Sequence, residues 1–355
     1  MKKVFCLFLS VVFSVLLLSG CAETKINESI SSDPGVTGDE GAETRTIIDH
    51  NGDEVVLPVK IDRIAVADIF PLPSVLSVFF DSAEKIVAMA PASMTAAQNS
   101  LLSELYPEIL KADTSAINGT EVNTEELMKS DPQVVFYNAS SVNVGETLKK
   151  AGFNAVAISV NKWDYDCIET LNQWLGLLSQ IFPEDANDRA ELVRSYSEDA
   201  IDLISERTSE ISDAERARLF FLFQYSDESI ITSGKNFFGQ WWADAVGAVN
   251  VGEEMTEDKS VKTTMEQIYI WNPDTVIITN FTTAYPDDLY NNTVGAYDWS
   301  SIDAVNNKRV FKMPLGMYRS YTPGVDTPVT LKWLAKTVYP DLFADIDITA
   351  ETVEY

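Results

Sequence analysis

The sequence predicts an α/β fold with two lobes, and three observations support this prediction. Short buried strands alternate with helical segments, which is typical of βα units around a parallel sheet. A helix–turn–strand pattern occurs twice, 141 residues apart. A long stretch between the two copies has helical apolar spacing and no strand pattern. We therefore predict two Rossmann-like lobes joined by a long linker helix, with a ligand cleft between the lobes.

The length and charge of the chain limit its possible functions. Its 355 residues are enough for two domains that each bury a core. With 54 Asp and Glu against 26 Lys and Arg, the net charge is -28. Because binding to nucleic acid requires clustered basic side chains, this acidity argues strongly against a nucleic-acid partner.

The residues that commonly act in catalysis are scarce in this sequence, which argues against an enzyme. The chain has one histidine, His50, which excludes most catalytic mechanisms that use an imidazole as the base. It also lacks the GxGxxG, phosphate-loop and GxSxG patterns, and it has no cluster of His, Cys and carboxylates. We therefore expect a binding protein with no catalytic residues, no cofactor and no metal held by the protein.

Residues 1–20 have the pattern of an export signal, with Lys2 and Lys3 before an apolar run. This run is shorter than the ~20 residues that a membrane-spanning helix needs. It ends in Leu-Ser-Gly-Cys21, which resembles the lipobox of bacterial lipoproteins. That resemblance implies cleavage before Cys21 and lipidation of its thiol, with palmitate among the acyl groups; an ordinary secretory signal is the alternative. Residues 21–43 are predicted to be a flexible tether.

The N-terminal lobe is predicted over residues 44–165. It begins with two β-branched runs separated by Asn51-Gly52, which is a strong hairpin pattern. Residues 63–67 and 85–89 follow as short apolar runs that are typical of buried strands.

The internal repeat relates this lobe to the second one. Residues 123–136 (NTEELMKSDPQVVF) and 264–277 (TMEQIYIWNPDTVI) each predict a capped helix, a proline turn and a buried strand. Superposing the two prolines aligns Glu125 with Glu266, Leu127 with Ile268, Asp131 with Asn272 and Val135 with Val276. The repeat therefore predicts equivalent elements in the two lobes.

The helical linker is predicted over residues 166–212 and the C-terminal lobe over 213–355. Residues 167–182 and 185–211 have separate helical patterns, on either side of Pro183. Cys167 lies in the first pattern and is predicted to be a small buried apolar residue. A helical connection between lobes is expected to limit hinge motion.

Several fragments in a fixed order resemble a known family over about residues 45–343. Besides the hairpin and the repeat, they are Trp174-Leu-Gly176, Gly247-Ala-Val-Asn250, Trp299-x-x-Ile302, Arg309-Val-Phe311, Pro323-Gly324, Trp333-Leu-Ala335 and Tyr339-Pro340. This pattern resembles the helical-backbone (class III) solute-binding lipoproteins of ABC importers, which handle ferric siderophores, cobalamin and haem.

The resemblance implies a monomeric, lipid-anchored extracytoplasmic protein. It would capture an iron(III)-siderophore-type metal chelate and deliver it to an ABC importer permease. Cobalamin or another corrinoid, or haem, is the alternative ligand within the family, and an enzyme on a similar scaffold is a weaker alternative. The positions of Glu125 and Glu266 match the family's permease-docking glutamates. The alternative is that both are acids favoured by the dipole in a first helical turn.

A ligand cleft is expected at the loops that follow the strands, where the two lobes face each other. The candidate ligand-binding residues there are Phe70, Tyr137, Trp163, Tyr225, Trp241, Phe281, Tyr318, Arg319 and Tyr321. Arg319 stands out because an isolated guanidinium could bind carboxylate, hydroxamate or phosphate oxygens. Core packing is the alternative for most of the aromatic residues. With so few cations, the sequence favours a weakly charged ferric hydroxamate or a corrinoid over a catecholate.

Overall fold

The structure, a computed structural model, describes residues 43–185, 188–255 and 259–355. The predicted signal segment, Cys21 and nearly all of the predicted tether lie outside these residues. Strands β1 (Thr44–Ile48) and β2 (Glu54–Pro58) pair antiparallel as the predicted hairpin. Gly52 in its turn has a φ of 87°, a conformation that glycine adopts without strain. None of the described helices is long and apolar enough to cross a membrane.

The N-terminal lobe contains a four-stranded parallel sheet in the order β4-β3-β7-β8. Its strands are β3 (Ile64–Val66), β4 (Ile86–Met89), β7 (Val134–Asn138) and β8 (Ala155–Ile158). Its helices are α1 (Leu72–Phe80), α2 (Pro91–Gln98), α3 (Leu101–Leu105), the short η1 (Pro107–Lys111), α4 (Thr124–Lys129) and α5 (Val142–Lys150). A small hairpin, β5 (Ile117–Asn118) and β6 (Glu121–Val122), precedes α4.

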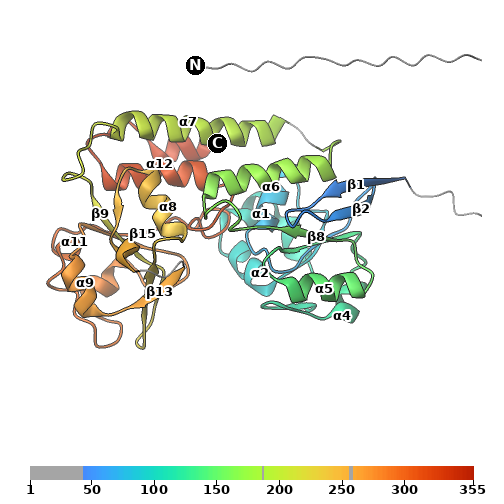
Figure 1. The fold of residues 1–355 in the computed structure, drawn as a ribbon, viewed down its shortest axis with the longest axis horizontal. Coiled ribbons are helices and arrows are strands. Elements are labelled where there is room, and N and C mark those ends of the chain that lie inside the picture. Colours follow the sequence, from blue (N-terminus) through green and yellow to red (C-terminus); the bar gives the residue numbers. More distant parts are fainter. Residues whose placement is uncertain (1–42, 186–187, 256–258) are drawn as a thin grey trace, which may run out of the picture. The chain divides into compact units, whose positions relative to one another are not determined.

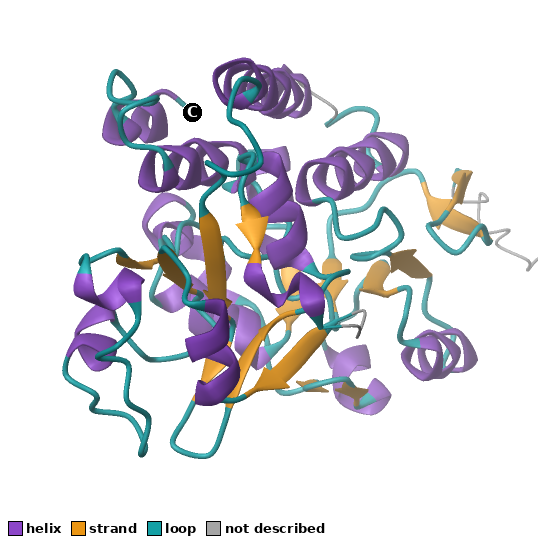
Figure 2. Ribbon diagram, turned by 60° about the vertical axis from the view of Figure 1, so that its left-hand side comes forward, coloured by secondary structure: helices purple, strands orange, loops and turns teal. Residues whose placement is uncertain are grey.

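The C-terminal lobe has a second four-stranded parallel sheet in the order β12-β9-β14-β15, and helices flank its strands (Figure 2). These strands are β9 (Arg218–Leu222), β12 (Val249–Asn250), β14 (Thr275–Ile278) and β15 (Val310–Lys312). A three-stranded antiparallel sheet consists of β10 (Gln224–Tyr225), β11 (Ile230–Ser233) and β13 (Ser260–Thr263). The helices are α8 (Phe238–Ala245), η2 (Val251–Glu254), α9 (Met265–Trp271), α10 (Pro286–Tyr290), α11 (Asp303–Asn306), α12 (Thr327–Val338) and α13 (Ile348–Glu354).

The predicted repeat consists of equivalent elements in the two sheets. Its helices are α4 and α9, and each leads into the third strand of its sheet, β7 or β14. Asn123 and Thr264 cap these helices by accepting backbone N–H bonds through their side chains. The aligned Asp131 and Asn272 both have a positive φ, of 43° and 39°. Asp and Asn tolerate this left-handed conformation better than most residues do, which accounts for their place before the two prolines.

The linker consists of two helices, α6 (Cys167–Ile181) and α7 (Asp188–Thr208), rather than one uninterrupted helix (Figure 1). Pro183 follows the end of α6 and has no N–H with which to continue it. Buried α7 side chains join both cores: Val193 packs in the N-terminal core and Ile204 in a C-terminal one. Cys167 is fully buried as predicted, and burial raises the pKa of its thiol.

Candidate functional site

A cavity of about 460 Å³ lies between the two lobes, and we call it the interlobe cleft. The N-terminal lobe contributes the end of α2, and the C-terminal lobe contributes the end of β15 and the loops that follow β14 and β15. Its lining residues are Thr95, Ala96, Asn99, Asn280, Thr282, Thr283, Tyr285, Lys312, Met313, Leu315 and Arg319. The carboxyl ends of parallel strands are the usual place for ligands in α/β proteins, and this volume is in the usual range for small-molecule sites.

Arg319 brings a cation to the wall of the interlobe cleft. Its guanidinium carbon lies 4.9 Å from the centre of the Phe281 ring and 5.7 Å from that of Tyr318. In the parts of the chain that the structure describes, Arg319 belongs to no ion pair. Aromatic faces stabilise the guanidinium but leave its N–H groups able to bind an oxygen-rich ligand.

Lys312 also lines the interlobe cleft, but its ammonium is used to hold a loop. Its Nζ donates to the carbonyl oxygens of Thr279 (2.9 Å), Thr282 (2.7 Å) and Ala284 (2.9 Å). Burial lowers the pKa of Lys312 to about 8. Because the three N–H donors already have acceptors, Arg319 is the better placed of the two cations to contact a ligand.

Replacing Lys312 with methionine should therefore destabilise the loop after β14. The variant leaves three carbonyl oxygens without their donor, and we expect a loss of about 1–3 kcal/mol in the free energy of unfolding. Urea denaturation followed by circular dichroism measures this change. Lys235→Met is the matched control because Lys235 is exposed and does not line the interlobe cleft. Equal stability of the two variants would contradict the loop-holding role of Lys312.

The wall behind Arg319 is an aromatic cluster of the C-terminal lobe. Phe281 lies with its ring centre 5.0 Å from that of Phe223 and 6.5 Å from that of Tyr321. Tyr321 is fully buried, and its backbone carbonyl accepts a hydrogen bond of 2.9 Å from Nε1 of Trp242. The segment that carries Arg319 is thus attached to the core of its lobe immediately after the cation.

The structure places four of the predicted ligand-binding residues together. Arg319 lines the interlobe cleft, Phe281 and Tyr318 lie against its guanidinium, and Tyr321 packs behind Phe281. Burial raises the pKa of Tyr318 to about 12, so its phenol is neutral at physiological pH. A direct contact of these aromatic residues with a ligand stays a prediction.

Of the nine predicted residues only Arg319 lines the interlobe cleft, and the five outside the group around it lie elsewhere in the two lobes. Tyr137 is buried in the N-terminal lobe, and Phe70 packs against the same apolar cluster. Tyr225 is buried and accepts a hydrogen bond of 3.0 Å from Nε1 of Trp299. Trp163 packs edge-on against His50, and Trp241 against Trp242. Their assignment to the ligand site rests on the sequence alone.

Arg319 is the one predicted ligand-binding residue in the lining of the interlobe cleft, and the sequence reasoning missed polar lining residues such as Thr95, Asn99 and Lys312. Thr95 and Asn99 lie four residues apart at the end of α2, so they share one face of the helix. The side chain of Asn99 donates to the carbonyl of Thr95 at 2.7 Å. Polar residues at this spacing also occur on ordinary solvated helix faces, which explains why the pattern did not identify them.

The two candidate docking glutamates occupy equivalent places in the two lobes. Glu125 is in the first turn of α4 and Glu266 in the first turn of α9, and both are exposed. Within the described ranges neither belongs to an ion pair. In Figure 1, α4 and α9 lie at the lower edge of the two lobes and α7 at the upper edge. Both carboxylates are therefore free to contact a partner.

No group of three or more His, Cys, Asp or Glu side chains within residues 43–185, 188–255 and 259–355 is arranged to hold a metal ion. Among the described residues, the site consists of the cations of Arg319 and Lys312, aromatic rings, amides and hydroxyls. Such groups can hold a ligand through its oxygen atoms and its apolar faces.

Comparison with known proteins gives a consistent result. Residues 77–315 match a family described as periplasmic binding protein. The molybdate-binding protein MolA of Haemophilus influenzae is 25% identical over 259 residues, which are 66% of this chain and 68% of MolA. A periplasmic solute binding protein from Veillonella parvula is similar in structure, with 28% identity and a TM-score of 0.76 over 87% of this chain and 90% of that one.

Two further structures share the fold at lower sequence identity. MolA bound to molybdate has 21% identity and a TM-score of 0.70, covering 86% of this chain and 94% of its own. Helicobacter pylori CeuE in a Ni-His complex has 20% identity and a TM-score of 0.68, covering 87% and 92%. These two proteins share one fold but were solved with different ligands, molybdate in one and Ni-His in the other.

Proposed function

The chain belongs to the periplasmic binding protein family of ABC transporters, and on that premise we propose that it captures an iron(III)-siderophore-type metal chelate outside the cytoplasm. It then delivers this chelate to an ABC importer permease. Proteins of this family bind and carry solutes and are not enzymes. A corrinoid or haem is the alternative ligand of the same class.

Arg319 in the interlobe cleft is the observation that carries this proposal. Its guanidinium has no acidic partner among the described residues and is backed by aromatic rings. The oxygen atoms of a ferric hydroxamate can accept hydrogen bonds from the planar N–H groups of a guanidinium, while apolar parts of the chelate contact aromatic and aliphatic side chains. Only two cations, Arg319 and Lys312, are among the described residues that line the cleft, and this small number supports a weakly charged chelate over a triply charged one.

A tetrahedral oxyanion such as molybdate is a second candidate. It is favoured by the similarity to MolA, whose name states that it binds molybdate. The guanidinium of Arg319 and the Asn99 amide, which has a second N–H besides the one bound to the Thr95 carbonyl, could donate to such an anion. The cleft volume of about 460 Å³ favours the larger chelate instead.

A ligand panel decides between these candidates. Isothermal titration calorimetry of the purified protein would use a ferric hydroxamate, a ferric catecholate, nickel with histidine, cobalamin, haem and molybdate. The proposal expects the ferric hydroxamate to bind with a Kd below about 10 μM. Tight binding of molybdate alone would establish the second candidate. If no member of the panel binds, capture of this group of ligands is wrong.

Permease docking is tested with the double substitution Glu125→Ala and Glu266→Ala. We propose that these carboxylates pair with basic groups on the permease, so uptake by cells should fall about tenfold or more while ligand affinity is unchanged. The matched control is Glu126→Ala with Glu228→Ala, which removes two exposed or half-exposed acids from other positions. Normal uptake by the first variant, or loss of its ligand binding, would contradict docking by these residues.

We also propose that Cys21 carries a lipid that anchors the mature protein to the cell membrane on its extracytoplasmic side, at the cell surface or in the periplasm. The support is the lipobox-like sequence before Cys21, which lies outside the described residues. Mass spectrometry of the membrane fraction tests the anchor. A lipid-modified N-terminal Cys21 is expected, and a mature N-terminus without lipid would contradict it.

A further inference from the structure

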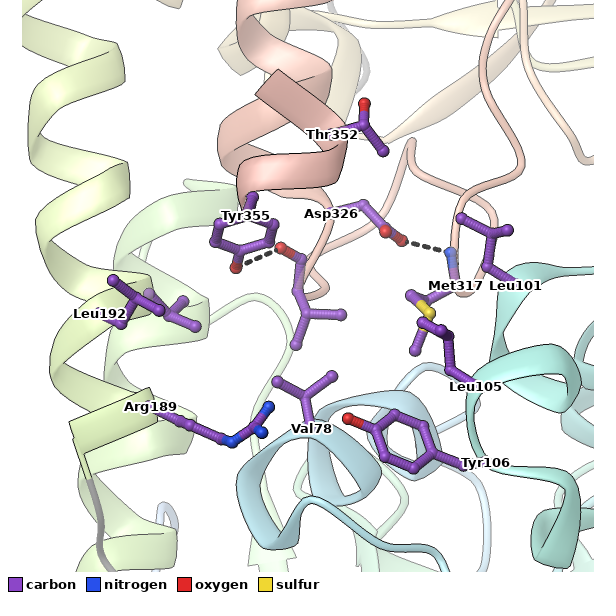
Figure 3. Close-up of a pocket in the computed structure, with 12 residues that line it drawn as sticks. Val78, Leu101, Leu105, Tyr106, Arg189, Leu192, Met317, Asp326, Thr352 and Tyr355 are labelled. Carbon is purple, nitrogen blue, oxygen red and sulfur yellow. Dashed lines mark hydrogen bonds between the residues drawn. The ribbon is translucent and has the colours of Figure 1, made fainter. Parts of the chain in front are cut away.

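A second cavity, of about 300 Å³, shares a loop with the interlobe cleft. We call residues 313–319 the Arg319 loop. Met313, Leu315 and Arg319 line the cleft, whereas Met317 lines the second cavity. The other lining residues of this cavity come from α1, α3, α7 and the C-terminal segments: Val78, Leu101, Leu105, Tyr106, Arg189, Leu192, Val193, Val325, Asp326, Thr352 and Tyr355 (Figure 3).

Asp326 holds the Arg319 loop through backbone amides. Its Oδ2 accepts from the N–H of Met317 at 2.7 Å (Figure 3) and also from that of Tyr318 at 3.4 Å. Gly316 has a φ of 58°, and a Cβ at this position would lie 2.6 Å from the Asp326 carboxylate. Glycine thus provides both the left-handed turn and the close approach of the carboxylate. Arg319 follows with a φ of 31°, which non-glycine residues rarely adopt.

The N-terminal lobe holds the same loop from the other side. The carbonyl of Gly316 accepts from the N–H of Leu101 at 3.2 Å, and that of Met317 accepts from Oγ of Ser100 at 3.0 Å. Both donors are at the start of α3. The amides of the loop therefore face one lobe and its carbonyls the other. A loop fixed at both sides has little freedom to relocate the side chain that follows it.

We propose that Asp326 is a positioning residue for ligand binding: its carboxylate fixes the Arg319 loop against α3 and thereby sets the guanidinium of Arg319 in the interlobe cleft. The expected effect of Asp326 on ligand affinity rests on the proposed function. The anchoring of the loop is itself independent of any ligand.

The same geometry makes ligand affinity sensitive to acid. Burial raises the pKa of Asp326 to about 6, against backbone hydrogen bonds that lower it. The charged and titratable groups that share its cavity are Arg189 from α7, Tyr106 after α3 and Tyr355 from the C-terminal segment, and Tyr318 lies in the loop that it holds; Glu351, one turn before Tyr355, is paired elsewhere. Arg189 pairs with Asp81 at 2.7 Å and Glu351 with Lys332 at 2.6 Å.

Burial raises the pKa values of these three phenols, which therefore stay neutral between pH 5 and 8. Protonation of Asp326 below about pH 6 removes the charge from the acceptor of two N–H bonds, and charge-assisted bonds are about twice as strong as neutral ones. Affinity should consequently fall as the pH is lowered from 7.5 to 5.

Hydrogen–deuterium exchange tests the anchoring without a ligand. The amides of residues 316–319 should exchange at least about tenfold faster in Asp326→Ala than in the wild type, because the carboxylate acceptor is lost. Asp347→Asn is the matched control: Asp347 also accepts two backbone N–H bonds at the start of a helix, but it does not line either cavity. Unchanged exchange in Asp326→Ala would overturn the proposal, whether or not a ligand is known.

Calorimetry with a ferric hydroxamate tests the effect on affinity. Asp326→Ala should bind about tenfold more weakly, and Asp326→Asn should lose the difference between pH 7.5 and pH 5 that the wild type has. If Asp326 acts through Arg319, Asp326→Ala combined with Arg319→Ala should bind no more weakly than Arg319→Ala alone. Additive losses in the double variant, or the same pH dependence in Asp326→Asn as in the wild type, would overturn the positioning role. Failure of this chelate to bind while the loop amides behave as expected would count against the proposed function instead.

Discussion

Substitution of Arg319 with alanine is expected to weaken ligand binding by about 10- to 150-fold, which corresponds to about 1.5–3 kcal/mol for a hydrogen bond to a charged group. The reason is the absence of any acidic partner for this guanidinium in the described parts of the chain. Its guanidinium lies against Phe281 and Tyr318, belongs to no ion pair among the described residues, and gains charged or polar acceptors when an oxygen-rich ligand arrives. Isothermal titration calorimetry with a ferric hydroxamate and with molybdate measures the loss.

Two further variants show which property of Arg319 matters. Arg319→Lys keeps the charge but loses the planar fork, so it should recover only part of the affinity. Lys235→Ala removes an exposed cation that does not line the interlobe cleft, and its affinity should equal that of the wild type. An unchanged affinity in Arg319→Ala, or an equal loss in Lys235→Ala, would remove Arg319 from the binding site.

The size of the effect also separates the two candidate ligands. A chelate that contacts aromatic and aliphatic side chains keeps part of its binding free energy when Arg319 is lost, because apolar burial does not depend on the guanidinium. A tetrahedral oxyanion has no such contacts and depends on charge and donors alone. Arg319→Ala should therefore lose nearly all binding of molybdate but only part of the binding of a ferric hydroxamate. Together with the wild-type affinities for the two compounds, this difference identifies the main ligand.

The fold could be predicted where local chemistry decides the structure. Asn51-Gly52 between two β-branched runs specified the first hairpin, and the positive φ of Gly52 is what that turn requires. The repeat predicted equivalent elements, and Asp131 and Asn272 share a left-handed backbone because their short polar side chains tolerate it. The two helical patterns predicted on either side of Pro183 correspond to α6 and α7. The chain contains two helices there, and Pro183, after the first, is the local reason.

The site was predicted less completely, because a strand-end aromatic residue and a core aromatic residue have the same local pattern. Tyr318 lies against Arg319, whereas Tyr137 and Tyr225 follow the same pattern and are buried away from the interlobe cleft. Arg319 could be identified because a cation between two tyrosines has no place in an ordinary core. The contacts of Asp326 depend on a turn that only the folded chain brings together, so no spacing in the sequence predicts them.

Among residues near the interlobe cleft, Trp242 is the one whose substitution should lower the free energy of unfolding most. This side chain is fully buried in α8, and its ring centre lies 4.8 Å from that of Trp241. Its Nε1 donates to the carbonyl of Tyr321, two residues after Arg319. Trp242→Ala should lower the free energy of unfolding by about 3–5 kcal/mol, since it removes a large apolar ring and leaves a cavity.

Trp242→Phe separates the hydrogen bond from the packing. Phenylalanine keeps most of the apolar volume but cannot donate to Tyr321, so the cost should fall to about 1–3 kcal/mol for the unpaired carbonyl and the lost volume. Trp241→Ala is the control, because Trp241 is only partly buried and a smaller loss than for Trp242→Ala is expected. Urea denaturation gives the three values. If Trp242→Phe also weakens ligand binding while the protein remains folded, the hydrogen bond to the Tyr321 carbonyl contributes to positioning the Arg319 loop. A variant with full affinity would show that Asp326, α3 and Asn280 hold the loop without this bond.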